Sequence, residues 1–138
     1  MKRQNKTTLT IFLSVLSLGL FAREVRALDI ADTRFLSTPA ITTGKISFVY
    51  ADDIWVADAD GGHPRRLTSH PGEEQSPYFS PDGKSIAFTA SYDGNVDAYV
   101  IPTEGGEPTR LTWHPGDDLV RGFTPEGKVL FSSPREAF

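Results

Sequence analysis

The side chains best suited to proton transfer in this sequence are two histidines in matching surroundings. His70 lies in the segment RLTSHPG and His114 in RLTWHPG, so each precedes a Pro-Gly pair. An imidazole can transfer protons near neutral pH or bind a metal ion. Two copies at one position of a repeated segment fit a part of the framework better than one catalytic centre. We therefore expect each imidazole to cap a loop.

Clustered acidic residues are the usual ligands of calcium. Asp52, Asp53, Asp58 and Asp60 lie close together in the sequence. Their spacing lacks the Asp-x-Asp-x-Asp-Gly ladder and the distal Glu of a calcium-binding loop. We interpret them as solvated residues of turns.

Two acidic pairs, Glu73-Glu74 and Asp117-Asp118, follow the two histidine segments. In a ring-shaped protein such pairs can line one rim and attract basic peptide ends by electrostatic steering. The interpretation that we prefer is a solvated loop.

A hydrolytic nucleophile is not recognisable. The chain has no Cys, which excludes thiol catalysis, thiolate metal sites and disulfides. No Ser lies in a Gly-x-Ser-x-Gly elbow, and no His-Glu-x-x-His motif is present. We therefore expect no catalytic, cofactor-binding or metal-ligating residue in this chain, and no cofactor.

The elements that position these residues are repeated with a period of 44, because segment 61–84 matches segment 105–128. Periods between about 20 and 50 residues are typical of solenoids, propellers and arrays. The identical pairs are Gly61/Gly105, Gly62/Gly106, Pro64/Pro108, Arg66/Arg110, Leu67/Leu111, Thr68/Thr112, His70/His114, Pro71/Pro115, Gly72/Gly116, Phe79/Phe123, Pro81/Pro125, Gly83/Gly127 and Lys84/Lys128.

Short β-rich runs separated by tight turns predict an all-β meander. The turns SPDGK (Ser80–Lys84) and TPEGK (Thr124–Lys128) carry Pro and Gly where tight turns require them. The strands expected for the first repeat are Lys45–Tyr50, Asp53–Ala57, Arg65–Thr68 and Ser76–Ser80. Those expected for the second are Ser85–Ala90, Val96–Ile101, Thr109–Thr112 and Leu119–Phe123.

Four antiparallel strands in each repeat are typical of a β-propeller blade. The alternatives are a β-sandwich, which does not require a 44-residue sequence period, and a β-solenoid, whose coils are shorter than 44 residues. The expected repeats are about 45–84, 85–128 and an incomplete 129–138, that is, two blades and the start of a third from a six-bladed propeller. We expect six residues on the strands that follow turns to be buried, namely Ile46, Phe48, Ile86, Phe88, Leu130 and Phe131.

Residues 1–27 have the pattern of a secretory signal peptide. Three basic residues lie within positions 1–6, an apolar run covers 9–21, and Val25 and Ala27 suit a cleavage site after Ala27. An uncleaved anchor or a disordered basic tail is the alternative. The expected location is periplasmic or secreted, with residues 28–44 as an N-terminal extension and 45–138 as the partial propeller.

The charge of the expected mature chain limits its partners. The formal net charge is −4, and residues 1–27 contribute +4, so −8 remains after cleavage. An acidic chain is unsuited to nucleic acid and to anionic membranes. We therefore expect neither nucleic acid nor, after cleavage, a membrane as a partner.

The segment GGHPRRLTSHPGEEQSPYFSPDGKSIAFTASYDGN resembles the repeat of TolB-type propellers. The sequence is still more similar to the start of tricorn-type proteases, through ISFVYADDIWVADADGG, RLTSHPG, RLTWHPG and GFTPEGKVLFSS. This resemblance covers about Pro39–Pro134. It implies a large modular serine peptidase with two propellers, a PDZ domain and catalytic domains, whose propellers act as gated conduits for peptides. Family relatives without a signal peptide are cytoplasmic.

The resemblance places no catalytic residue of the family on this chain. It implies as partners peptides or unfolded polypeptide, and the remaining blades and catalytic domains of a longer exported protein. The alternatives are a non-catalytic periplasmic propeller of the TolB type and the propeller of a prolyl-oligopeptidase-type hydrolase. The TolB type carries an α/β domain before its propeller, for which Leu28–Gly44 are too few residues.

Overall fold

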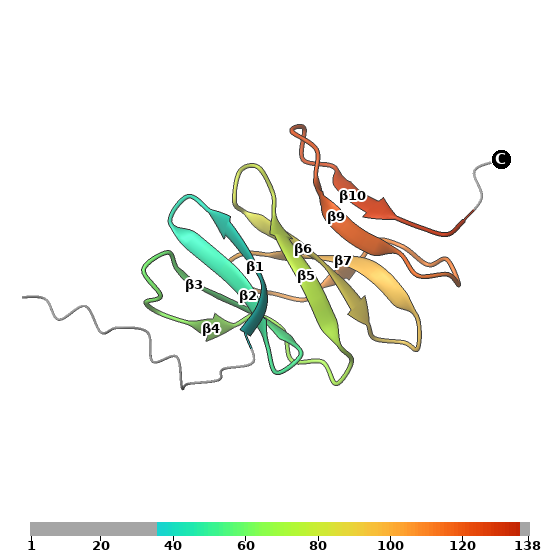
Figure 1. The fold of residues 1–138 in the computed structure, drawn as a ribbon, viewed down its shortest axis with the longest axis horizontal. Helices are drawn as coiled ribbons and strands as arrows, with labels where there is room; N and C mark the ends of the chain where they lie inside the picture. The colour runs from blue at the N-terminus through green and yellow to red at the C-terminus, as the bar shows by residue number, and fades with distance from the viewer. Residues whose placement is uncertain (1–35, 136–138) are drawn as a thin grey trace, which may run out of the picture. The chain divides into compact units, whose positions relative to one another are not determined.

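The computed structural model describes residues 36–135, which form three antiparallel β-sheets that follow one another in chain order (Figure 1). Sheet 1 contains β1 (Leu36–Thr42), β2 (Lys45–Tyr50), β3 (Asp53–Asp58) and β4 (Arg65–Arg66). Sheet 2 contains β5 (Glu74–Phe79), β6 (Ser85–Ser91), β7 (Val96–Pro102) and β8 (Thr109–Arg110). Sheet 3 contains β9 (Leu119–Phe123) and β10 (Val129–Ser132). This confirms the prediction of two four-stranded propeller blades and the start of a third.

Tight turns join consecutive strands inside each sheet. At the SPDGK turn the backbone amide of Ser80 donates to the carbonyl of Ser85 at 2.8 Å, and Gly83 has a φ of 69°. Glycine adopts this left-handed conformation without steric strain. At the TPEGK turn the matching amide, that of Thr124, donates to the carbonyl of Lys128 at 2.8 Å, so this turn closes one residue sooner. The turn residues seen in the sequence therefore produce the hairpins expected of them.

The sheets begin one strand earlier than the repeats 45–84 and 85–128 that the sequence predicts. The strand predicted over Ser76–Ser80 as the end of the first repeat is β5, which pairs with β6 and opens sheet 2. Likewise β9 opens sheet 3, and β1 completes sheet 1 from within the predicted extension 28–44. The physical reason is that the five-residue turn after β5 forms a β-hairpin, which pairs β5 with β6. The longer loop between β4 and β5 is where the chain crosses to the next sheet.

Two apolar clusters hold the sheets together. The cluster between sheets 1 and 2 contains Val49, Ile54, Ile86, Phe88, Ala90, Tyr99 and Ile101. The cluster between sheets 2 and 3 contains Ala87, Ala98 and Val120. Strand β6 serves both clusters, since successive side chains of a strand point to opposite faces.

The burial predictions hold for sheet 2 and fail for sheet 3. Ile86 and Phe88 are fully buried, as predicted. Ile46 and Phe48 are only half-buried, so the prediction is not met for them. They alternate with the buried Ser47 and Val49 and so lie on the other face of β2. The prediction is wrong for Leu130 and Phe131, whose exposed fractions are 47% and 40%. In the described range β10 pairs only with β9, so no further strand covers these side chains.

The predicted signal peptide and cleavage site lie outside the described residues. Within residues 36–135, no helix is long and apolar enough to cross a membrane.

Candidate functional site

A network of mostly buried polar side chains recurs at matching positions of the first two blades. Its members come from the third strand, the fourth strand, and the segment that leads into the first strand of the next sheet. The matched pairs, each 44 residues apart, are Asp53/Asp97, Arg66/Arg110, Thr68/Thr112 and Glu74/Asp118. The Asp–Arg ion pair and the bond from the Arg Nε to the Thr carbonyl are present in both blades, which makes this network the main candidate site among the described residues.

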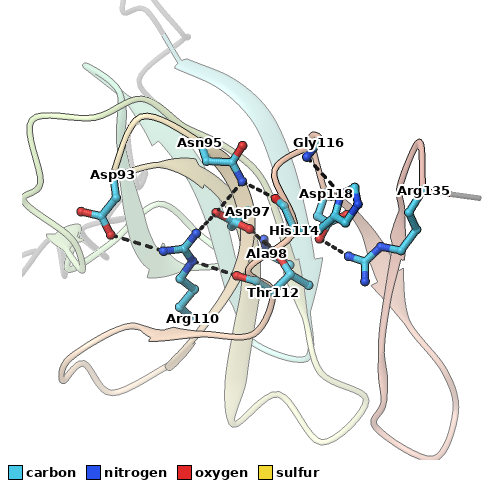
Figure 2. Close-up of polar contacts among 10 residues, drawn as sticks. All are labelled: Asp93, Asn95, Asp97, Ala98, Arg110, Thr112, His114, Gly116, Asp118 and Arg135. Atoms are coloured by element: carbon cyan, nitrogen blue, oxygen red, sulfur yellow. Dashed lines mark hydrogen bonds and ion pairs between the residues drawn. The ribbon is translucent and has the colours of Figure 1, made fainter.

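In sheet 2 the network centres on Asp97, whose exposed fraction is 1% (Figure 2). Arg110 reaches its Oδ2 at 2.5 Å and also donates from Nε to the carbonyl of Thr112 at 2.8 Å. The Thr112 hydroxyl donates to Asp97 Oδ1 at 3.0 Å and accepts from the amide of Ala98 at 3.0 Å. The exposed Asp93 lies 3.4 Å from the same guanidinium. The carboxylate therefore ties β7 to the short outer strand β8.

The two histidines cap their loops in the same way. His70 Nδ1 accepts a hydrogen bond from the amide of Gly72, and His114 Nδ1 accepts one from Gly116, both at 3.0 Å. Glycine is required at position 72, because a Cβ there would lie 2.0 Å from the carbonyl oxygen of Ser91. These contacts confirm the prediction of a loop-capping role for both imidazoles.

Glu74 joins sheets 1 and 2 through three donors. The amide of Ile54 donates to Oε2 at 2.9 Å, the Thr68 hydroxyl contacts the same oxygen, and the Tyr92 hydroxyl contacts Oε1. Burial raises the pKa of Glu74 above its usual value, while the hydrogen bonds from Thr68 and Tyr92 oppose that shift. Burial and the neighbouring carboxylate also raise the pKa of Tyr92, whose ring lies 3.9 Å from the ring of His70.

At the next junction Asp118 takes the place of Glu74 and has a different partner. Its side chain has no exposed surface, and its Oδ2 pairs with the guanidinium of Arg135. Arg135 also lies over the ring of Phe131, with 5.3 Å between Cζ and the ring centroid. A cation therefore neutralises Asp118 through Oδ2, whereas its buried Oδ1 has no donor among the described residues; at the first junction only neutral donors reach Glu74.

These contacts correct two expectations for the acidic residues. The acidic pairs are not simply solvated, since Glu74 and Asp118 are buried while Glu73 and Asp117 are exposed. Asp53 is not a solvated turn residue either: its exposed fraction is 7%, and its Oδ2 lies 2.8 Å from Arg66 Nη2.

The remaining residues of that acidic cluster fit the solvated interpretation. Asp52 and Asp60 are exposed. Asp58 accepts a hydrogen bond from His63 at 2.7 Å. This contact lowers the pKa of Asp58 and raises the pKa of His63.

The network could have been inferred from the sequence by the 44-residue spacing of its members, although not from their residue types alone. Asp53/Asp97 and Arg66/Arg110 recur at the period of 44 even though only the second pair lies in the matched segments. Recurrence of an acid and a base at fixed positions of two blades indicates a structural pair.

Two hollows flank the junctions of the sheets. A cleft of 360 Å³ lies beside the first histidine loop and is lined by Leu67, His70, Tyr92 and Glu107, among others. Another of 440 Å³ lies between sheets 2 and 3, where Val100, Leu111 and Phe123 meet two tight turns. Among residues 36–135, no three His, Asp or Glu side chains lie close enough together to hold a metal ion.

Comparisons with known proteins agree with this architecture. The sequence matches the family model described as the tricorn protease N-terminal beta propeller domain over residues 33–138. Tricorn protease homolog 1 of Streptomyces coelicolor is 40% identical over 54 residues, which are 39% of this chain and 5% of that protein.

Two solved structures share the fold. The crystal structure of the tricorn protease superposes with a TM-score of 0.64 at 31% identity, over 72% of this chain and 11% of that chain. TolB from Acinetobacter baumannii superposes with a TM-score of 0.60 at 34% identity, over 72% of this chain and 27% of that chain. The chain thus spans a small part of the length of each relative.

Proposed function

Because the chain belongs to the family of tricorn protease N-terminal β-propeller domains, we propose that it is the propeller portion of an exported, tricorn-like serine-type peptidase. Its task is to hold or guide peptides and unfolded polypeptide for catalytic domains that lie outside this chain. The match to the family model over residues 33–138 is the observation that carries this proposal.

The chemistry of the described residues supports a role in handling peptides. The buried acids of the repeated network and their arginine partners hold strands together. No His ring in residues 36–135 is hydrogen-bonded to a Ser or Thr hydroxyl. Peptide hydrolysis needs such an activated nucleophile beside a base. The exposed acids Glu73 and Asp117 favour basic peptide ends by electrostatic steering.

The proposed domain order begins with a signal peptide, residues 1–27, cleaved after Ala27. The propeller segment follows, and β1 of the first blade already begins at Leu36. In the proposal the remaining blades and the catalytic domains belong to the same longer protein.

A non-catalytic propeller of the TolB type is the second candidate function. It is favoured by the superposition on TolB, which covers the same share of this chain as the superposition on the tricorn protease, 72%. The gene downstream of Phe138 distinguishes the candidates. A PDZ domain followed by a Ser-containing catalytic domain supports the proposal, a stop after about six blades supports the TolB type, and a Gly-x-Ser-x-Gly domain supports a prolyl-oligopeptidase-type hydrolase.

The proposal predicts that the purified chain binds unfolded casein without cleaving it. The assay combines a binding measurement on labelled, unfolded casein with turnover of fluorogenic peptides. Turnover that His70→Ala or His114→Ala abolishes would overturn the predicted inactivity of this chain. Failure to bind casein would contradict the peptide-handling role.

A further inference from the structure

The cleft of 360 Å³ beside the first histidine loop is formed by parts of two blades. Residues 67–70 come from the end of the first blade, and Tyr92 and residues 106–108 come from the second. The volume is near the lower end of the range for ligand sites, roughly 300–1,000 Å³. The cleft is therefore suited to one side chain of a peptide.

The two positions that give this cleft its space and its charge are positions where the repeats differ. Segments 61–72 and 105–116 are identical except at the pairs His63/Glu107, Arg65/Thr109 and Ser69/Trp113. Ser69 and Glu107 line the cleft, whereas the other residues of these segments that line it are the same in both repeats. The framework of the cleft is thus repeated, while the small Ser69 and the acidic Glu107 are particular to this junction.

The ring of His70 is fixed in one orientation and one tautomer. It lies 3.9 Å from the ring of Tyr92, and its Nδ1 accepts from the Gly72 amide at 3.0 Å. Because an amide N–H can only donate, the proton of the neutral imidazole is on Nε2. Within residues 36–135 this Nε2–H has no acceptor. His70 therefore offers a hydrogen-bond donor to a ligand in the cleft.

Glu107 gives the cleft a carboxylate that has no cation beside it. Its side chain is exposed, and it forms no ion pair within the described residues. The neighbouring Arg65 is engaged elsewhere, since its Nη2 donates to the Thr103 carbonyl and lies 3.6 Å from Glu104 Oε2. The chain as a whole has a formal net charge of −4, which also favours a cationic ligand.

We propose that this cleft binds the side chain of a lysine or arginine residue in an extended polypeptide. The inference rests on the proposed peptide-handling function and names the type of residue that is recognised. The charged head pairs with Glu107, the methylene stem lies against Leu67 and Pro108, and His70 Nε2–H donates to a backbone carbonyl of the polypeptide. Long basic side chains commonly bury their stem along an apolar surface and keep the charged head in water.

The first test uses the wild-type full chain and pentapeptides of the form Gly-Gly-X-Gly-Gly with both ends blocked. X is lysine, norleucine or glutamate, and NMR signals of the Leu67 methyl groups and the His70 ring report binding in the cleft. We expect the lysine peptide to bind about fivefold more tightly than the norleucine peptide, the size of effect of one partly exposed ion pair. Equal binding of these two peptides, tighter binding of the glutamate peptide or unchanged Leu67 and His70 signals would overturn the proposal.

Two variants then place in the first cleft the residues that the other repeat carries. Glu107→His removes the carboxylate and is expected to reduce binding of the lysine peptide to the level of the norleucine peptide. Ser69→Trp fills the cleft and is expected to abolish binding of both peptides. Since His63 and Trp113 already occupy the matching positions, the backbone accommodates both substitutions. Unchanged binding of the lysine peptide in either variant contradicts the proposal.

Glu104→Gln is the matched control, because it removes an equal charge three positions away from a side chain that does not line the cleft. We expect less than about a twofold loss, since solvent and salt screen this charge. A loss equal to that of Glu107→His would mean that only the general field of the protein attracts the peptide.

Binding of unfolded casein, measured on the same samples, separates this inference from the proposed function. Casein binding by wild type without binding of the lysine peptide overturns the cleft and leaves the peptide-handling role intact. Absence of casein binding contradicts that role itself.

Discussion

At the scale of single residues, burial of charge follows from partners that are distant in the sequence. Asp97 lies in β7, and the guanidinium that neutralises it belongs to Arg110, 13 residues later. Glu74 accepts from Ile54, 20 residues earlier. Acids are seldom fully buried unless they are paired. From the sequence, an acidic residue beside turn residues is therefore interpreted as solvated, because its distant partner is known only from the tertiary structure.

The pair formed by Asp97 and Arg110 gives a prediction at this scale. Arg110→Ala leaves a carboxylate with an exposed fraction of 1% without its cation. Removing one partner of a buried pair costs about 3–5 kcal/mol, and we expect the low end because Thr112 still donates to Asp97. Urea denaturation of the full chain measures the loss.

Arg121→Ala is the matched control for this experiment. The Arg121 side chain is exposed and contacts the Ser132 hydroxyl, so its removal is expected to change stability by less than about 0.5 kcal/mol. Equal effects of the two variants would contradict the role given to the buried pair.

At the scale of elements, tight turns keep consecutive strands paired in one sheet. The SPDGK turn keeps β5 and β6 paired, with Phe79 opposite Ile86. The loop between β4 and β5 carries the chain to the next sheet and is held by His70 and by the Glu74 carboxyl group. The 44-residue period gives the number of residues per blade, but it does not show at which residue one sheet ends and the next begins.

The two faces of β6 give a prediction at the scale of elements. Phe88 is fully buried between sheets 1 and 2, and its ring stacks on Tyr99 with 5.8 Å between the centroids. We expect Phe88→Ala to lower the free energy of unfolding by about 3–5 kcal/mol, because it creates a cavity in a packed core. The measurement is denaturant unfolding followed by tyrosine and tryptophan fluorescence.

Phe131→Ala removes the same side chain from a strand where its exposed fraction is 40%. A clearly smaller loss is expected there, since little packing is lost. A loss as large as that of Phe88→Ala would mean that sheet 3 is covered in solution.

At the scale of the whole molecule, large apolar side chains remain exposed on the first and the last sheet. Ile41 and Leu36 of sheet 1 have exposed fractions of 75% and 50%, and Leu130 of sheet 3 has 47%. Propeller blades bury such faces against neighbouring blades. This pattern fits the proposal that the chain works as part of a longer propeller protein.

Export is the prediction that concerns the whole chain. The basic start, the apolar run over 9–21 and the Val25-x-Ala27 end predict a mature protein that begins at Leu28. Mass spectrometry of the protein from the periplasmic fraction measures its first residue. A cytoplasmic protein that retains Met1 would contradict both the signal peptide and the exported location.

The turns, the blades and the histidine loop caps of this protein could be predicted from its sequence, because each depends on residues that are close together in the chain or recur at a fixed spacing. Turn type depends on a few contiguous residues, so SPDGK and TPEGK predicted their hairpins, and the 44-residue period predicted the blades, while the family was indicated by the resemblance of individual motifs. The matching positions of His70 and His114 were enough to predict their loop-capping role.

Burial and pairing were decided only by the tertiary structure. Whether β5 belongs to sheet 1 or 2, whether Glu74 is solvated, and whether Phe131 is covered each depend on neighbours far away in the chain. A run of residues specifies its own backbone geometry, but its solvent exposure is a property of everything packed around it.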